Sequence, residues 1–437
     1  MNTVPLRAKV SRCLYSGLFY LGLPLVLWRL KKRARQAPAY GERIAERFGH
    51  TPARQDQPLW IHAVSVGETV AIAPLVEQLL TEQPELPLLI TNTTPTGSAR
   101  VKALFGERVS HCYAPYDLPH LLRRFLNRVQ PRGLLIVETE LWPNTIAACH
   151  GRNIPVLLAN ARLSERSARG YQKVRALSQP MVQQLSCVAA QDNDSGQRFI
   201  ELGLPAEQLT VTGSIKFDQQ PPTDAAHQGQ QLRQQWGEQR PVLVAGSTRE
   251  LEGKTEETAL LQAYATLKQQ HPNLLLVLVP RHPERFESVY QQAQAAGWQV
   301  GRRSDNSIRQ TSEVVIGDTM GELASFYAAA DLCFVGGSLV ETGGHNPLEP
   351  AMLGKPVLMG PHLFNFSDIS QQLQACGGLS IVDNPEQLSA AIDTLLTHPD
   401  QARQQGLAAQ QFIQQNQGAL VRLYRQVCDT FELSHNT

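Results

Sequence analysis

The chain of 437 residues is longer than one compact domain usually is and suits two domains of about 200 residues each. Its composition of 42% hydrophobic, 18% charged and 6% aromatic residues excludes a disordered chain, a collagen-like repeat and a protein with many membrane spans. Forty basic residues against 39 acidic residues give a net charge of +1, so no overall positive field indicates nucleic-acid binding.

An uncharged apolar run of sixteen residues lies between Arg12 and Arg29, with basic residues on both sides. No small-residue cleavage site follows it, which disfavours a signal peptide, and the flanking basic clusters disfavour a buried core helix. A spanning helix needs about 20 apolar residues, so this run, with Pro24 inside, is short, and a helix lying in one leaflet fits about as well. We predict a single membrane anchor with a basic flank over residues 1–37, spanning or monotopic.

The anchor also predicts an orientation, because basic residues are more numerous on its C-terminal side. This bias favours a cytoplasmic location for the globular part. The cysteines agree with a reducing compartment, since they show no C-x-x-C pair and no histidine at zinc spacing. We expect buried free thiols at all seven positions, which are 13, 112, 149, 187, 333, 376 and 428.

From residue 58 onward, short apolar runs alternate with amphipathic stretches of helical period. Continuous apolar strands joined by helices are typical of a parallel sheet covered on both faces. A polar, Gln-rich stretch at 219–239 interrupts the pattern and predicts a linker near residue 220. The fold class is therefore α/β, with two doubly wound domains at 38–220 and 221–437, and the last helix is a candidate for packing back on the first domain. The expected strands are 58–65, 86–92, 111–115, 133–139, 155–160, 186–190, 241–247, 274–280, 314–318, 332–337, 356–360 and 379–383.

The most specific stretch follows the expected strand 332–337, and ligands of such sheets bind at the carboxyl ends of strands. Its glycines allow a ligand to approach backbone N–H groups, and a helix start there favours a phosphate. The helix is expected to open at Asn346–Pro347, with Asn346 as its cap. Glu349 then either closes a capping box or binds two vicinal hydroxyls.

These features resemble a GT-B glycosyltransferase, in which two Rossmann-like domains face a central cleft and the second domain holds a nucleotide-sugar. Further motifs narrow the resemblance to the 3-deoxy-D-manno-octulosonic acid (Kdo) transferases of lipopolysaccharide assembly, glycosyltransferase family 30. They run in order along most of the chain. The motifs are HAVSVGET (62–69), TNTTPTGSARV (91–101), YAPYDLP (113–119), ETELWPN (138–144), ANARLSERSARGY (159–171), VTGSIKFD (211–218), VPRHPERF (279–286), GDTMGEL (317–323) and FVGGSLVETGGHNPLEPA (334–351).

The resemblance implies an inverting transfer of Kdo from CMP-Kdo to a hydroxyl of the tetraacyl-disaccharide lipid A precursor (lipid IVA), with release of CMP. It places the reaction in lipopolysaccharide core biosynthesis, at the cytoplasmic face of the cell inner membrane. The expected partners are the donor, the acceptor and inner-membrane lipid, with no nucleic acid and no cofactor.

The candidate base is Glu68, which lies in the first turn of a helix after the expected strand 58–65. The helix dipole stabilises a carboxylate there, so we expect Glu68 to be ionised at neutral pH and exposed. Without the resemblance, an ordinary helix-start residue remains an alternative explanation of Glu68. The resemblance assigns it the role of proton acceptor and makes Glu138 and Lys216 the transition-state stabilisers. Glu140 would project from the same side as Glu138, so the two acids remain interchangeable at this point.

The donor site is expected in the second domain, with Arg281 binding phosphate or the Kdo carboxylate and Ser247 and Thr248 donating to phosphate. A CMP-sugar has one phosphate, so a metal is not demanded, and we expect none. Asp192-Asn193-Asp194 imitates a D-x-D metal motif but is better explained by helix capping. The CMP contacts implied by the resemblance are Pro280, Arg281, Met320, Gly321, Glu322, Asn346, Pro347, Leu348 and Glu349, of which Glu349 grips the ribose.

The acceptor site is expected in the first domain, because lipid A is amphiphilic and bisphosphorylated and needs basic residues near the membrane. The basic segment 31–50 supplies some, and Arg100, Arg123 and Arg124 are further candidates. A strand-to-helix turn formed by Thr94, Pro95, Thr96 and Gly97 suits an anionic group.

Two other classes of function share some of these features. A UDP-sugar enzyme with this fold, a glycosyltransferase or epimerase of cell-envelope biosynthesis, would share the Gly-rich turn and the ribose glutamate. Neither would carry SVGE together with ETELWPN. A membrane-tethered nucleotide-sugar-binding protein without activity would have no use for an exposed Glu68.

Overall fold

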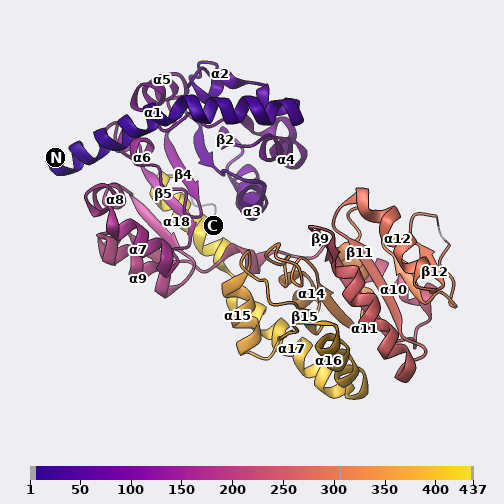
Figure 1. Ribbon diagram of the computed structural model, residues 1–437. Coiled ribbons are helices and arrows are strands. Elements are labelled where there is room, and N and C mark those ends of the chain that lie inside the picture. The colour runs from indigo at the N-terminus through magenta and orange to yellow at the C-terminus, as the bar shows by residue number, and fades with distance from the viewer. Residues whose placement is uncertain (1–5, 306, 435–437) are drawn as a thin grey trace. The chain divides into compact units, whose positions relative to one another are not determined.

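A computed structural model describes residues 6–305 and 307–434 and divides the chain into two α/β units (Figure 1). The first unit contains the chain up to Gln219 together with the chain from Gln417 onward. The second unit is the continuous segment Gln220–Asn416. The C-terminal segment, which the sequence assigns to the range of the second domain, therefore lies with the first unit.

The first unit is built on a seven-stranded parallel sheet with the order β3-β2-β1-β4-β5-β6-β7. Five of its strands are buried along their whole length, which is why they read as continuous apolar runs in the sequence. The short edge strand β7 was not predicted, because only three residues with partly exposed side chains form it. The strands are β1 (Leu59–His62), β2 (Leu88–Asn92), β3 (Ser110–Tyr113), β4 (Gly133–Val137), β5 (Val156–Ala161), β6 (Cys187–Ala190) and β7 (Leu209–Val211).

Helices connect these strands, and several begin with a Ser, Thr or Asp cap or with proline in the first turn. The α-helices are α1 (Leu6–Gln36), α2 (Ile44–Arg47), α3 (Val66–Glu82), α4 (Pro95–Phe105), α5 (Pro119–Val129), α6 (Pro143–His150), α7 (Glu165–Lys173), α8 (Arg175–Val182), α9 (Asn193–Leu202) and α18 (Ala419–Phe431). Short 3₁₀ turns are η1 (Pro38–Gly41), η2 (Gly106–Arg108), η3 (Ala206–Gln208) and η4 (Ile215–Asp218).

Helix α18 completes the core of the first unit, although it follows the whole second unit in sequence. Leu423, Val427 and Phe431 are buried in the same cluster as residues of β1 and β4. Gly133 leaves room for the Phe431 ring, since a Cβ there would lie 2.3 Å from it. The carboxylate of Asp218 accepts the backbone N–H groups of Gly418 and Leu420 at 2.6 and 2.7 Å, which fixes the start of the helix.

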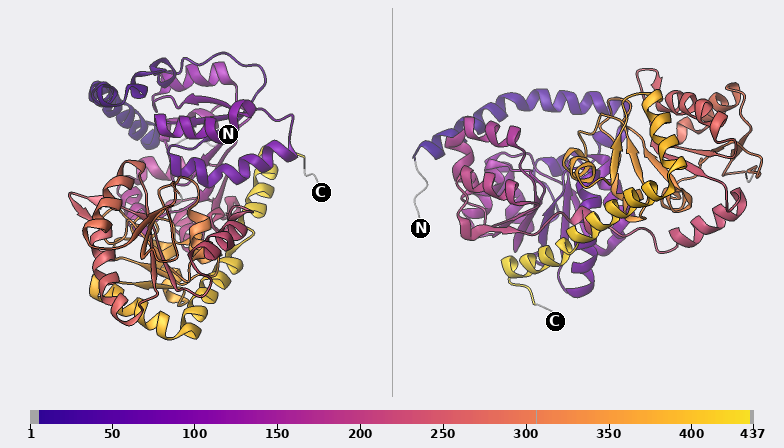
Figure 2. Two further views of the ribbon diagram at one scale, coloured as in Figure 1. Left: turned by 90° about the vertical axis from the view of Figure 1, so that its right-hand side faces the viewer. Right: turned by 90° about the horizontal axis from the view of Figure 1, so that it is seen from below.

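Helix α1 lies along the first unit and does not stand away from it (Figures 1 and 2). Its inner side bonds to the domain, with the Ser16 hydroxyl 3.0 Å from the Asn144 amide nitrogen and the Tyr20 hydroxyl 2.5 Å from His120 Nδ1. Phe19 packs against Tyr116. The outer side is apolar and solvent-exposed, with residues recurring every three to four positions: Leu6, Val10, Leu14, Leu18, Leu21, Leu25 and Trp28.

The second unit contains another seven-stranded parallel sheet, of order β12-β13-β11-β8-β14-β15-β16, and a small hairpin of β9 and β10. Its strands are β8 (Val242–Thr248), β9 (Glu250–Leu251), β10 (Lys254–Thr255), β11 (Leu275–Pro280), β12 (Val300–Arg302), β13 (Val314–Ile316), β14 (Leu332–Val335), β15 (Val357–Met359) and β16 (Leu379–Ile381). Its helices are α10 (Ala225–Trp236), α11 (Glu256–Gln270), η5 (Pro283–Arg285), α12 (Phe286–Ala295), α13 (Leu323–Ala329), α14 (Leu348–Met352), α15 (Ser367–Ala375), α16 (Pro385–Thr397) and α17 (Pro399–Asn416).

Two sequence predictions are wrong in detail. Most of the expected linker 219–239 is helix α10, whose buried residues Ala225, Gly229, Leu232 and Trp236 recur at helical spacing among many glutamines. Glutamine is a good helix former, and tertiary packing on α13 completes the element. The expectation that every cysteine is buried fails at Cys13 and Cys376, which are exposed.

Candidate functional site

Glu68 occupies the third position of α3 and is held by the turn that follows β1. Ser65 caps the helix by accepting the Glu68 backbone N–H at 3.3 Å, while its hydroxyl donates to Glu68 Oε1 at 2.8 Å. The Val64 backbone N–H donates to Oε2 at 2.7 Å. The pattern is reciprocal, as in a capping box, but the carboxylate accepts the Ser65 hydroxyl and the Val64 backbone N–H in place of the Ser65 backbone N–H, and both of its oxygens are fixed.

The environment of Glu68 differs from the expectation that it is exposed and ionised at neutral pH. The residue is only 8% exposed, and burial raises the pKa of its carboxyl group to about 7, against the opposing hydrogen bonds from Ser65 and Val64. Nearby charges on Glu140 and Glu138 raise the pKa further. Desolvation therefore outweighs the helix dipole, and a pKa near neutrality is the value at which a general base works best.

Glu138 and Lys216 form an ion pair in the same unit, with Lys216 Nζ 3.0 Å from Glu138 Oε1. Glu138 directly follows β4 and has a left-handed backbone (φ 59°), which a non-glycine residue adopts at a cost. Lys216 lies in η4, the turn fixed to the start of α18 by Asp218. Because Glu138 contributes to the pKa of Glu68, the three predicted catalytic residues share one neighbourhood.

The neighbouring acid Glu140 is placed differently from Glu138. Burial raises the pKa of Glu140, against a hydrogen bond from Trp142, and the charge of Glu138 raises it further. The ion pair with Lys216 belongs to Glu138. The two acids are therefore not equivalent: Glu138 is paired with a cation, whereas Glu140 forms no ion pair with the described residues and its charge acts on Glu68.

The turn expected to receive an anion is a conventional helix cap. Thr94 accepts the Gly97 backbone N–H at 3.2 Å, and the Thr96 hydroxyl lies 3.3 Å from that of Thr94. A Cβ at Gly97 would lie 3.1 Å from Asn92, so glycine permits the close approach of helix and strand. The N–H of Gly97 is thus committed to the cap, and Thr96 is the exposed hydroxyl residue of the turn.

In the second unit, the Gly-rich loop after β14 already holds a carboxylate. Glu256 is 1% exposed and accepts the backbone N–H groups of Gly337, Ser338 and Leu339 at 2.6, 2.9 and 2.8 Å, and that of Arg249 at 2.8 Å. The expectation that this part of the loop offers free N–H groups to a phosphate is therefore wrong. Glu256 instead fixes the loop next to the end of β8.

The two hydroxyl residues at the end of β8 differ in their availability. The Thr248 hydroxyl is fully buried and donates to Glu257 at 2.5 Å, and Glu257 forms a bidentate ion pair with Arg285. The Thr248 hydroxyl is thus bonded to Glu257 in the core and is not free to donate to a phosphate. Ser247, by contrast, has a left-handed backbone (φ 57°) and a hydroxyl without a hydrogen-bond partner among the described residues.

Glu349 lies in the first turn of α14, which begins at Leu348, two residues later than expected. Asn346 still acts as a cap, since its side-chain oxygen accepts the Leu348 backbone N–H at 3.1 Å, and its amide nitrogen lies 3.4 Å from Glu349 Oε1. Burial raises the pKa of Glu349, while the Asn346 amide and the charge of Arg281 act in the opposite direction. Pro347 and Leu348 are buried and hold the turn in place.

Several cationic or titratable groups surround the loop that precedes α14. Burial lowers the pKa of His345 to about 4, and the charges of Arg281, Arg249 and His282 lower it further. Arg281 follows β11 at Pro280, and its backbone N–H donates to Thr248 at 3.0 Å. His345 is therefore neutral at pH 7, while the arginines supply the positive charge that a phosphate or carboxylate needs.

The turn after β13 presents backbone and an exposed side chain. Gly321 has a positive φ of 88°, and the side chain of Met320 is 61% exposed. Glu322 accepts hydrogen bonds from Arg303 Nη2 at 2.7 Å and from the Thr319 hydroxyl. Burial acts to raise the pKa of Glu322, but these hydrogen bonds hold it below the ordinary value. The carboxylate is thus internally paired, which leaves backbone groups of the turn for a ligand.

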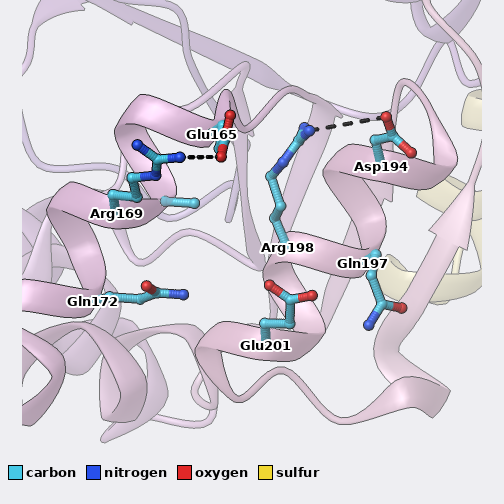
Figure 3. Close-up of a pocket in the computed structure, with 8 residues that line it drawn as sticks. Glu165, Arg169, Gln172, Asp194, Gln197, Arg198 and Glu201 are labelled. Atoms are coloured by element: carbon cyan, nitrogen blue, oxygen red, sulfur yellow. Dashed lines mark hydrogen bonds and ion pairs between the residues drawn. The ribbon is translucent and has the colours of Figure 1, made fainter.

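Asp192-Asn193-Asp194, which resembles a D-x-D metal motif, forms a helix cap, as the sequence predicts. Asp192 accepts the Ser195 backbone N–H at 2.6 Å and the Ser195 hydroxyl at 3.0 Å at the start of α9. Figure 3 shows the groove between α7 and α9, where Asp194 points toward Arg198, 3.9 Å away. Among residues 6–305 and 307–434, no group of three or more His, Cys, Asp and Glu side chains is placed to hold a metal ion.

The match to known proteins covers nearly the whole chain. A family model described as 3-deoxy-D-manno-octulosonic-acid transferase (kdotransferase) matches residues 42–219, and one described as glycosyl transferases group 1 matches residues 230–412. The 3-deoxy-D-manno-octulosonic acid transferase of Haemophilus influenzae is 43% identical over 417 residues, which cover 94% of this chain and 97% of that protein. The chain belongs to the Kdo transferase family.

Further relatives agree with this Kdo transferase assignment, and the protein is a glycosyltransferase. The transferase of Bordetella pertussis is 38% identical over 426 residues, covering 93% of this chain and 97% of that protein. The crystal structure of UDP-GlcNAc 2-epimerase from Neisseria meningitidis is 14% identical with a TM-score of 0.56, covering 86% of this chain and 99% of that chain. At that identity the epimerase shows the GT-B fold alone.

The buried carboxylates of α11 are not apparent from the sequence. Glu256 and Glu257 directly follow the capping residue Thr255, so they look like ordinary acids of a first helical turn. Their partners lie in loops up to 83 residues away, as the bond from Leu339 shows. The available signal was the pair of adjacent acids next to the strand end Ser247–Thr248.

Proposed function

We propose that the protein transfers Kdo with inversion from CMP-Kdo to a hydroxyl of a lipid A precursor, with Glu68 as the general base. Membership of the Kdo transferase family supports the sugar and the reaction class. The observation that carries the base assignment is the Glu68 carboxyl group, held by Val64 and Ser65 with a pKa raised by burial to about 7.

In the proposed reaction, the ionised form of Glu68 accepts the proton of the acceptor hydroxyl while that oxygen attacks the anomeric carbon of Kdo. The bond between this carbon and the CMP phosphate oxygen breaks, and CMP leaves with the electron pair. A single displacement inverts the anomeric centre. The carboxyl group of Glu68 then releases its proton to water, which is rapid for a group with a pKa of about 7.

The pair of Glu138 and Lys216 supplies fixed charge to this step. Positive charge develops on the sugar as the leaving bond breaks, and Glu138 stabilises it. The departing phosphate and the Kdo carboxylate are anionic, and Lys216 stabilises them. The 3.0 Å contact keeps both charges oriented before substrate binds, so little reorganisation is needed during the reaction.

The donor nucleotide binds to the second unit in this proposal. Arg281 and Arg249 provide charge for the phosphate or the Kdo carboxylate, and both act on the half-buried His345 beside the loop. The backbone of the turn at Met320–Gly321 binds cytosine. Glu349 accepts hydrogen bonds from the ribose hydroxyls at the start of α14. The proposal does not use the Thr248 hydroxyl, which is committed to Glu257.

The reaction is tested by incubating the purified protein with CMP-Kdo and the tetraacyl-disaccharide precursor and measuring the products by mass spectrometry. We expect the acceptor to gain the mass of Kdo and CMP to appear in equal amount. Binding calorimetry with CMP and UDP runs in parallel, and we expect binding of CMP. Binding of UDP with no gain of Kdo would contradict the proposal and favour a UDP-sugar enzyme.

Replacing Glu349 with glutamine is expected to weaken CMP binding by about tenfold or more while the melting temperature changes little. The amide can still accept the Asn346 hydrogen bond, but it loses the charge-assisted bonds to the ribose hydroxyls, worth about 1.5–3 kcal/mol. Calorimetry measures the affinity. The control ligand is 2′,3′-dideoxy-CMP, whose binding should barely change because it has no ribose diol. Equal weakening of both nucleotides would show that Glu349 is only structural.

We further propose that α1 holds the protein on the membrane as a monotopic helix lying in the plane of one leaflet. Its inner side is docked on the first unit from Ala8 to Tyr20, a length of about 18 Å. The polar flank of a folded domain cannot lie beside a helix inside the hydrocarbon core, where every polar group needs a partner. The exposed apolar stripe from Leu6 to Trp28 is then the surface that enters the leaflet.

Placing charges on this stripe is expected to release the protein from membranes. The double substitution Leu18→Glu and Leu21→Glu changes side chains that are 70% and 80% exposed, so folding should be unaffected. We expect binding to phosphatidylcholine vesicles in a flotation assay to fall by tenfold or more, since two charges would enter the apolar leaflet. The matched control substitutes the exposed Leu407 and Val421 with glutamate. Undiminished flotation of the α1 variant would contradict the in-plane anchor.

A further inference from the structure

A basic groove lies beside the inner side of α1, between this helix, α5 and α6. Arg12 of α1, Arg123 of α5 and Arg152, just beyond α6, line it, and Ala147, Ala148 and Gly151 contribute a floor of small residues. The groove has a volume of about 250 Å³, which suits a headgroup phosphate with its glycerol. No aspartate or glutamate belongs to its lining.

The positive charges of the groove arginines are available to an anionic ligand. None of the three forms an ion pair with a residue in the described parts of the chain. The guanidinium of Arg152 donates to the Asn127 side chain at 2.6 Å, which is a neutral partner and leaves the charge uncompensated. Three cations around one concave surface, without an acid among its lining residues, favour an anionic ligand.

The groove also lies at the right depth for a lipid headgroup. An α-helix with its side chains is about 10 Å across, so groups on the inner side of α1 lie about that far from its outer apolar stripe. If the stripe enters the leaflet, the inner side lies at the level of the phosphates. None of Glu68, Glu138, Lys216 and Thr94, which carry the proposed chemistry and acceptor turn, lines this groove.

We propose that the groove of Arg12, Arg123 and Arg152 binds the phosphate of an anionic phospholipid of the bilayer and so sets the orientation of the protein on the membrane. The inference deepens the proposed membrane role of α1 and rests on it. It assigns the groove to a bilayer lipid and not to the acceptor, although both carry phosphate. Apolar attachment by α1 and phosphate recognition by the groove are then two separate contributions to membrane binding.

The test compares vesicles of phosphatidylcholine alone with vesicles containing phosphatidylglycerol. We expect the full-length protein to prefer the anionic vesicles. The double substitution Arg12→Gln and Arg152→Gln should remove most of that preference, at about fivefold in affinity per arginine, while binding to phosphatidylcholine stays unchanged. The control, Arg166→Gln with Arg403→Gln, removes the same charge from exposed positions outside the groove and should lose far less.

Three other outcomes of the vesicle and KM measurements would overturn the groove proposal. Equal losses in the groove variant and the control would show a diffuse charge effect, and a wild-type protein that does not distinguish the two vesicles would exclude a headgroup site. A raised KM for detergent-dispersed acceptor, with vesicle binding unchanged, would assign the groove to the acceptor. Absence of Kdo transfer would contradict the proposed function, and the vesicle measurement, which needs no turnover, would still decide the groove.

Discussion

Replacing Glu68 with glutamine is expected to lower kcat by about 10²-fold or more, with the affinity for CMP nearly unchanged. Glutamine keeps the size of the side chain and can still accept the hydrogen bond from the Val64 backbone N–H. It cannot accept a proton at neutral pH, so the attacking hydroxyl loses its base. Single-turnover kinetics with excess enzyme measure the chemical step, and retention of more than a tenth of the wild-type rate would remove Glu68 from this role.

The pH dependence of kcat/KM gives a second test of Glu68 as the general base. A general base must be deprotonated, so wild-type kcat/KM should rise from pH 5 to pH 8 with its midpoint near 7, where burial places the pKa of Glu68. The charge of Glu140 helps to raise that pKa, so Glu140→Gln should move the midpoint to lower pH while activity above pH 8 is largely kept. The residual activity of Glu68→Gln should not follow this profile. If the pH midpoint is the same in wild type, Glu140→Gln and Glu68→Gln, the assignment of Glu68 as the general base is contradicted.

The second large effect is expected at Glu256, whose carboxylate accepts four backbone N–H groups. Glutamine offers one acceptor oxygen and places an NH₂ group against the remaining donors. We expect Glu256→Gln to lower the free energy of unfolding by about 3 kcal/mol or more, because charge-assisted bonds contribute about 1.5–3 kcal/mol each and leave buried donors when lost. CMP affinity should fall as well, since the loop leads to Asn346 and Glu349.

Urea unfolding followed by circular dichroism measures this loss. The matched control is Glu252→Gln, a change to an exposed acid in the hairpin next to β8, which should stay within about 0.5 kcal/mol of wild type. A Glu256 variant as stable as this control would show that the carboxylate does not hold the loop.

The strands were predictable because a parallel sheet covered on both faces leaves a continuous apolar signature in each strand. The same logic failed for α10, where glutamines mask four buried residues, among them Leu232 and Trp236. The edge strand β7 was missed for a different reason. Strand β7 is short and partly exposed, so its three residues carry no clear period. Local pattern thus reveals elements in proportion to how completely they are buried.

The candidate site shows a similar limit. The position of Glu68 after a strand follows from local sequence, but burial and the charges of Glu140 and Glu138 raise its pKa to about 7, an effect that the helix-dipole argument from the sequence did not include. The Gly-rich loop was located correctly as a feature, yet three of its N–H groups donate to Glu256 of another helix. Residue types and spacing predict where chemistry can occur. Long-range packing decides which groups remain free for it.

The return of α18 to the first unit has a consequence for biosynthesis. Domains usually fold in the order in which they leave the ribosome, but here Leu423, Val427 and Phe431 reach the first core only after all of the second unit has been made. Until then, the space beside Gly133 that receives the Phe431 ring is empty, and the nascent first unit exposes apolar surface. The unit that starts first is therefore the one that finishes last. A chain stopped at residue 416 would carry a complete second unit and an unfinished first one, which is a substrate for chaperones and proteases.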